Sequence, residues 1–158
     1  MCFVLYVGTT DPLSLRKWGK NLPTPSVESL TERDSPIKQY FSKPSVQYVG
    51  STSNCGCDFP HAMFQGGGWP EIGYQVDEEK DELEIERDRI HNKNCEALVS
   101  LLRSTEDDFV ELYGVWDGDF AKRPEALENI SVEALLATDF CFKDRGFYRV
   151  RLKSSSGA

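Results

Sequence analysis

The chain has 158 residues, of which 39% are apolar and 28% are charged. These values are typical of one globular domain with a single hydrophobic core, and they exclude a disordered or fibrous protein. The net charge of −8 disfavours binding to nucleic acid, because an acidic surface repels phosphate groups. We expect one domain over residues 1–153, followed by a flexible tail at 154–158.

The N-terminal part of the chain predicts two strands and a short helix. Residues 2–8 are rich in β-branched and aromatic side chains and predict an inner strand. The alternation of apolar and polar residues over 27–30 predicts a short edge strand. A short helix over 37–41 follows, with either Thr31 or Ser35 as its N-cap.

A third strand, over residues 46–49, leads into a long irregular region. This region holds the polar loop 51–58 and the glycine-rich loop 65–70. Long loops of this kind within a compact domain are often functional. Apolar residues at helical spacing then predict one long helix over 78–103. We expect its charged first half to project into solvent and its second half to pack on the sheet.

The C-terminal third predicts a strand, a short helix and a hairpin. Residues 109–116 have the composition of a strand, and Ser131 is a candidate helix N-cap. Residues 140–142 and 147–152 flank a turn and predict a β-hairpin. Strands at both ends and a helix between them predict the α+β class. The expected fold is a mostly antiparallel or mixed sheet with one long helix and two short helices.

The clearest candidate site is a pair of cysteines in the polar loop. Cys55 and Cys57 flank a glycine, and His61 follows shortly after them. Thiolate and imidazole are ligands suited to zinc or another soft transition metal. Cys2 and Cys141 lie in other strand-like segments and could complete a set of four metal ligands.

Other interpretations of these cysteines stay open. Cys55 and Cys57 can close a small strained disulfide and act as a redox pair, although the carboxylate of Asp58 would raise a thiol pKa. Cys57 and His61 would form a nucleophilic pair if the imidazole lies within hydrogen-bond reach of the thiol. Cys2 could serve as an N-terminal nucleophile, although a core position on the first strand is favoured. In the simplest interpretation, all of them are small buried residues.

An acidic segment offers a function of a different class. Residues 77–90 contain eight acidic and three basic side chains. A helix with this charge could dock on a basic protein partner, and the attraction between opposite charges would speed the association. The chain would then be a non-enzymatic interaction module. The simpler interpretation is a solvated helix face.

Basic side chains gather near the predicted C-terminal strand. Because side chains alternate along a strand, several of these basic residues should share one face. The favoured interpretation is that they are surface residues exposed to solvent. The cluster consists of Lys143, Arg145, Arg149, Arg151 and Lys153.

The apolar segment over 2–7 lacks a basic leader and is too short for a signal peptide or a membrane span. Without a secretory signal, the odd number of five cysteines indicates reduced thiols rather than a disulfide framework. We therefore expect a cytoplasmic protein that does not associate with a membrane.

Several short motifs resemble those of a family of uncharacterised bacterial proteins of similar length. The resemblance covers most of the chain. It implies no activity, cofactor or catalytic residue. The motifs are Met1-Cys2-Phe3, Tyr48-Val49-Gly50, Cys55-Gly56-Cys57, Val110-Glu111-Leu112-Tyr113 and Trp116-Asp117-Gly118-Asp119.

Overall fold

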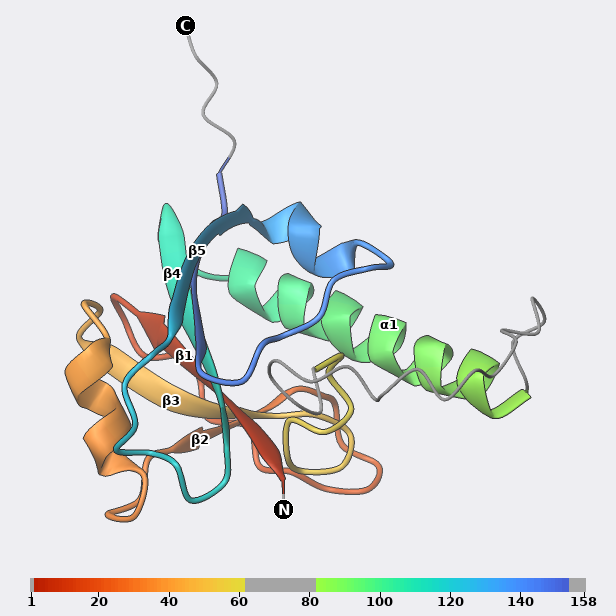
Figure 1. The fold of residues 1–158 in the computed structure, drawn as a ribbon, viewed down its shortest axis with the longest axis horizontal. Coiled ribbons are helices and arrows are strands. Elements are labelled where there is room, and N and C mark those ends of the chain that lie inside the picture. The colour runs from red at the N-terminus through yellow and green to blue at the C-terminus, as the bar shows by residue number, and fades with distance from the viewer. Residues whose placement is uncertain (1, 62–81, 154–158) are drawn as a thin grey trace, which may run out of the picture.

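The computed structural model describes residues 2–61 and 82–153 (Figure 1). Three predicted features lie outside these residues: the glycine-rich loop 65–70, the start of the acidic segment at 77–81, and the tail 154–158.

Six strands form one open mixed sheet in the order β2-β3-β1-β4-β6-β5. Every neighbouring pair is antiparallel except β5 and β6, which are parallel. This sheet and one long helix confirm the α+β class. The strands are β1 (Phe3–Thr9), β2 (Ser26–Ser29), β3 (Ser45–Gly50), β4 (Phe109–Trp116), β5 (Ala126–Ser131) and β6 (Gly146–Arg151).

Strand β1 lies inside the sheet, and all of its residues are buried because both faces of the sheet are covered. Phe3, Leu5 and Val7 point to the core on one face. Val4 and Tyr6 point to a second, smaller core on the opposite face. The inner position predicted for this strand is therefore confirmed, as is the edge position of β2.

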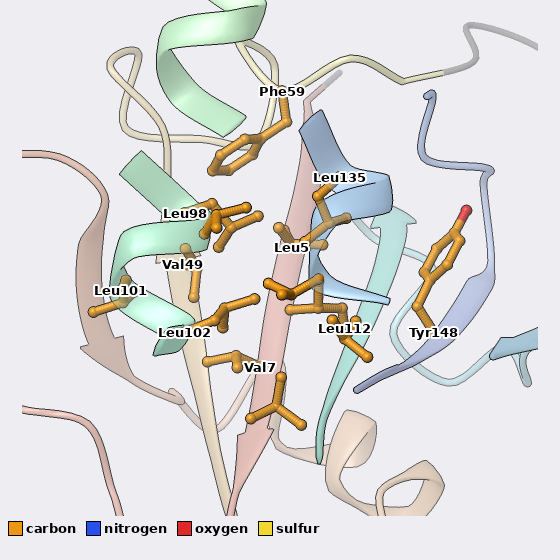
Figure 2. Close-up of a cluster of buried hydrophobic side chains, with 14 of the residues drawn as sticks. Leu5, Val7, Val49, Phe59, Leu98, Leu101, Leu102, Leu112, Leu135 and Tyr148 are labelled. Atoms are coloured by element: carbon orange, nitrogen blue, oxygen red, sulfur yellow. The ribbon is translucent and has the colours of Figure 1, made fainter. Parts of the chain in front are cut away.

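The long helix α1 (Glu82–Arg103) covers the first of these faces (Figure 1). Its second half buries Leu98 and Leu102 against β1 and Phe59 (Figure 2). Its first turns expose Leu83 and Ile85. Within residues 82–103, the predicted division into an exposed first part and a packed second half is confirmed. Within the described residues, no helix is both long and apolar enough to cross a membrane.

The two short helices are 3-10 helices, η1 (Ser35–Tyr40) and η2 (Val132–Leu136). Neither Thr31 nor Ser35 caps η1. Its N-cap residue is Asp34, and the carboxylate of Asp34 instead accepts a hydrogen bond from the Thr31 amide at 2.6 Å. Residues 31–34 therefore form a turn, closed by this hydrogen bond, before η1 begins.

The predicted hairpin of residues 140–142 with 147–152 is wrong. β6 pairs instead with β4 and with the unpredicted strand β5. Residues 140–142 form no strand; Phe142 instead makes an isolated parallel bridge with His61, and its amide donates to the carbonyl of Pro60 at 2.8 Å. The predicted turn itself does form.

Candidate metal centre

Three of the five candidate ligands lie together. The Sγ atoms of Cys2, Cys55 and Cys57 all lie within 4.8 Å of one another. Cys2 directly precedes β1, and the other two cysteines follow β3. β1 and β3 are antiparallel neighbours, so the start of β1 lies beside the end of β3. The pairing of two strands therefore brings distant parts of the chain to one point.

Backbone hydrogen bonds hold the cysteine loop against β1. The amide of Gly56 donates to the carbonyl of Phe3 at 2.7 Å. The loop is closed on itself, because the amide of Ser51 donates to the carbonyl of Cys55 at 2.7 Å. Asn54 adopts a φ of 66°, a left-handed conformation that asparagine tolerates better than most residues. These contacts fix the backbone on both sides of the first thiol.

The loop is also tied to α1 through a buried side chain. Asn94 lies on α1 and is almost fully buried. Its Oδ1 accepts a hydrogen bond from the amide of Thr52 at 3.1 Å, and its Nδ2 donates to the Thr52 hydroxyl at 3.2 Å. The hydroxyls of Thr52 and Ser53 in turn donate to the carboxylate of Asp58. The loop is therefore anchored to both the sheet and the helix.

The three thiols differ in exposure, and burial acts on their protonation. Cys2 is exposed, whereas Cys55 and Cys57 are half-buried. Burial, a hydrogen bond with the thiol of Cys57 and the charges of the neighbouring thiols raise the pKa of Cys55 to about 12, although the backbone amide of Cys57 acts in the opposite direction. This thiol therefore keeps its proton at neutral pH in the metal-free protein. A bound cation would favour the thiolate and release that proton.

A cavity of about 260 Å³ borders this cluster. It lies on the side of the sheet to which Val4 and Tyr6 point. The hydroxyl of Tyr6 donates to Asp34 Oδ2 at 3.2 Å, and Arg33 forms an ion pair with Asp117 at 3.2 Å. The cavity is lined by Cys2, Cys55, Tyr6, Tyr48, Arg33, Asp34 and Asp117, among others.

Sequence reasoning missed the polar residues around this cavity. Tyr6 could have been found, because alternation along β1 places it on the same face as Cys2. Arg33 gave no such signal, since it lies in a separate segment that meets the others only in the folded chain.

His61 and Cys141 lie outside the group of three sulfurs. The His61 ring stacks on Phe3 with ring centroids 4.9 Å apart, and its Nδ1 lies 2.8 Å from the carbonyl oxygen of Phe59. Cys141 is exposed, and its Sγ lies 3.8 Å from the carbonyl oxygen of Phe142. The structure therefore places these two candidates in other surroundings. No disulfide joins any of the described cysteines.

The sulfur separations suit a metal ion. In a tetrahedral site with Zn–S bonds of about 2.3 Å, neighbouring sulfurs lie roughly 3.8 Å apart. Sulfurs that lie within 4.8 Å of one another therefore need to move by about 1 Å or less to share one ion. Three thiolates would leave one position of a tetrahedral ion for another ligand.

Comparison of the chain with models of protein families, with curated proteins and with solved structures gave no match. The resemblance to a bacterial family therefore stays a prediction.

Proposed function

We propose that the chain binds zinc or another soft transition-metal ion through the thiolates of Cys2, Cys55 and Cys57. One observation carries this proposal: the three Sγ atoms lie within 4.8 Å of one another although they come from two separate segments. Thiolates are the ligands that select soft metal ions over magnesium or calcium. The hydrogen bonds from the loop to β1 and α1 support the proposal, because they hold the ligand backbone in place before any ion arrives.

The position of the site supports a role beyond structural bracing. Cys2 and Cys55 both line the 260 Å³ cavity, so an ion held by their sulfurs borders that cavity. A metal with three protein ligands can take its fourth ligand from such a space, as catalytic zinc sites do. The proposed site is therefore one that exchanges a ligand with solvent.

The test is metal analysis of protein purified without a polyhistidine tag. We expect one zinc or copper ion per chain, and titration of the metal-free protein with Co²⁺ should give the charge-transfer absorption of cobalt–thiolate bonds. Replacing Cys2, Cys55 or Cys57 by Ser should abolish this binding, because two thiolates hold the ion far more weakly. The matched control is Cys141→Ser, which removes an exposed thiol outside the cluster and should leave the stoichiometry unchanged. Sub-stoichiometric metal and no cobalt–thiolate absorption would refute the proposal.

A second candidate function uses the first turns of α1, as an interaction module for a basic protein partner. These turns expose Leu83 by 76% and Ile85 by 56% alongside acidic residues, so this part of the helix offers both charge and apolar surface. We expect salt-sensitive binding to a lysine-rich peptide, lost in the triple variant Glu82→Lys, Glu84→Lys, Glu86→Lys. The control variant Glu32→Lys, Glu106→Lys, Asp139→Lys carries the same change in charge at exposed positions elsewhere. Equal loss in both variants would show only the effect of net charge.

A further inference from the structure

A second cavity, of about 450 Å³, lies over β4, β6 and β5, far along the sheet from the cysteines. Val110 and Val150 of these strands belong to the core beneath α1, so alternation directs Phe109, Arg149 and Arg151 to the opposite face. The cavity is lined by Asp108, Phe109, Asn129, Ser131, Arg149 and Arg151, together with Ile130.

Strand register explains why these side chains meet. Arg151 is the cross-strand partner of Phe109 on β4 and of Ser131 on β5. Arg149 lies in the next row on the same face and is the partner of Asn129. Two guanidinium groups therefore stand beside an amide and a hydroxyl, all of which can donate hydrogen bonds.

The two arginines are the unpaired members of the basic cluster found in the sequence. Lys143 forms an ion pair with Glu128, Arg145 with Glu125, and Lys153 with Asp108. Across residues 2–61 and 82–153, neither Arg149 nor Arg151 has a carboxylate within ion-pair distance. The two basic residues of this cluster that form no ion pair with a described residue are therefore the two that line the cavity.

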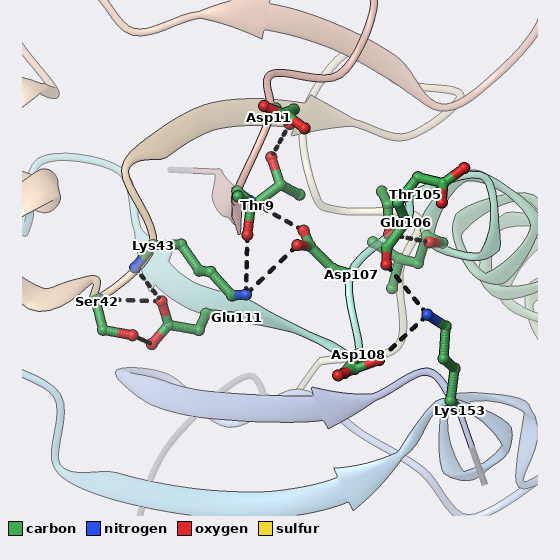
Figure 3. A network of polar contacts seen from close by, with 12 residues as sticks. Thr9, Asp11, Ser42, Lys43, Thr105, Glu106, Asp107, Asp108, Glu111 and Lys153 are labelled. Carbon is green, nitrogen blue, oxygen red and sulfur yellow. Dashed lines mark hydrogen bonds and ion pairs between the residues drawn. The ribbon is translucent and has the colours of Figure 1, made fainter.

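The acidic residues nearby already have partners (Figure 3). Glu111 is the register partner of Arg149, yet it accepts hydrogen bonds from the amides of Ser42 and Lys43 at 3.0 and 2.8 Å. Asp107 accepts a hydrogen bond from Thr10 at 2.9 Å and pairs with Lys43. These contacts leave the guanidinium edges available for an external anion.

Arg149 is held in place by an aromatic ring. Its guanidinium carbon lies 3.8 Å from the centroid of Phe109, a cation–π contact. A guanidinium stacked in this way loses little further freedom when it binds a ligand, and its edge can donate two hydrogen bonds to one oxyanion.

We propose that this cavity binds the phosphate group of a small phosphomonoester. A phosphomonoester carries close to two negative charges at neutral pH, which matches the two unpaired guanidinium groups, and its oxygens can also accept from Asn129 and Ser131. A cavity of 450 Å³ has room for the organic part of the ester as well as for the phosphate. A nucleic acid is a poor match, because its diesters carry one charge each and the chain carries −8.

The experiment is a titration of the full chain with inorganic phosphate, glycerol 3-phosphate and succinate, followed by the NMR signals of the arginine Nε–H groups. We expect saturable shifts at Arg149 and Arg151 with both phosphate probes, tighter for the ester, and weaker binding at higher ionic strength. Saturation by inorganic phosphate alone would reject the ester and with it the proposal. Succinate binding as tightly as either phosphate would also overturn it.

Two variants and a matched control complete the test. Arg149→Gln and Arg151→Gln should each weaken the ester about tenfold, as expected for the loss of one charged hydrogen-bonding group. Arg151 has no ion pair or ring contact among the described residues, so its replacement should not disturb the fold. The control Arg123→Gln removes an exposed arginine outside the cavity and should leave the affinity unchanged. Unchanged affinity in Arg151→Gln, or an equal loss in Arg123→Gln, would overturn the proposal.

Discussion

Gly56 lies directly against the backbone of Phe3, to whose carbonyl its amide donates a hydrogen bond at 2.7 Å. A Cβ atom added to Gly56 would lie 2.9 Å from the same carbonyl oxygen. Real Cβ atoms essentially never lie this close to another atom, so only glycine fits at this position. Both neighbours of Gly56 in the chain are proposed metal ligands. Because Gly56 has no side chain, the cysteine loop can lie directly against β1, next to Cys2.

Replacing Gly56 by Ala should push the loop away from β1. We expect a loss of stability of about 1–3 kcal/mol, typical of overpacking, and weaker metal binding. Chemical denaturation and cobalt titration measure the two effects. The control is Gly19→Ala, where the three atoms nearest to an added Cβ belong to the exposed side chain of Leu22 rather than to the backbone. If both variants bind cobalt equally well, the close approach does not position the ligands.

Asn94 should contribute to stability through its link to the cysteine loop. Replacing it by Ala removes two hydrogen bonds to Thr52 and one to the carbonyl of Ile90. We expect a loss of about 1–3 kcal/mol in the free energy of unfolding, because buried polar groups lose their partners. Asn92→Ala, an exposed position on the same helix, should change it by less than about 0.5 kcal/mol. Similar losses would show that the link is unimportant.

Bound metal should protect one of two exposed thiols from alkylation. Cys2 and Cys141 are both exposed, but only Cys2 belongs to the sulfur cluster. Addition of zinc should slow the alkylation of Cys2 strongly and leave that of Cys141 unchanged, since a metal-bound thiolate is shielded from the reagent. Mass spectrometry of peptides after timed alkylation measures both rates in one sample. Equal protection of the two thiols would point to non-specific binding.

Cys95 should be inert in the folded protein. Burial raises the pKa of its thiol to about 12, so almost no thiolate forms at pH 8. We expect it to react with a thiol reagent only after unfolding in urea, when all five cysteines react. Cys95→Ser should therefore leave the fast phase of the native reaction unchanged, whereas Cys141→Ser should reduce it. A fast reaction of Cys95 would show that α1 opens readily.

Asp107 should stabilise the fold in a pH-dependent way. Burial alone would raise its pKa, but hydrogen bonds from Thr10 and the charge of Lys43 outweigh burial and lower it. A carboxyl whose pKa is lowered on folding stabilises the protein above the unfolded-state value of about 3.9. This contribution is lost as the pH falls through the lower, folded-state value.

Asp107→Asn should cost about 1–3 kcal/mol at pH 7. The difference in stability from the unmodified protein should shrink as the pH falls below about 4 and then through the lower, folded-state pKa, where the unmodified carboxyl also becomes neutral. Urea denaturation at a series of pH values measures the difference. Asp139→Asn, at an exposed position, serves as the control. A difference that stays constant down to pH 2 would contradict this account of Asp107.

Local patterns along the chain predicted much of the fold. The strand over 109–116 has the bounds that its composition indicated, and the apolar residues near Leu98 predicted the packed half of α1. These features depend on residues a few positions apart, whose periodicity reflects one buried face. β5 was missed because it is an edge strand with alternating half-buried and exposed residues, so its apolar pattern is weak.

The sequence by itself determined the class of fold, the inner strand and the presence of closely spaced thiols. Only the tertiary structure decided which groups meet. It joined Cys2 to Cys55 and Cys57 through the pairing of β1 with β3, and it stacked His61 on Phe3. Periodicity records which face of an element is buried, whereas meetings between distant residues depend on strand register and packing, which no local pattern encodes.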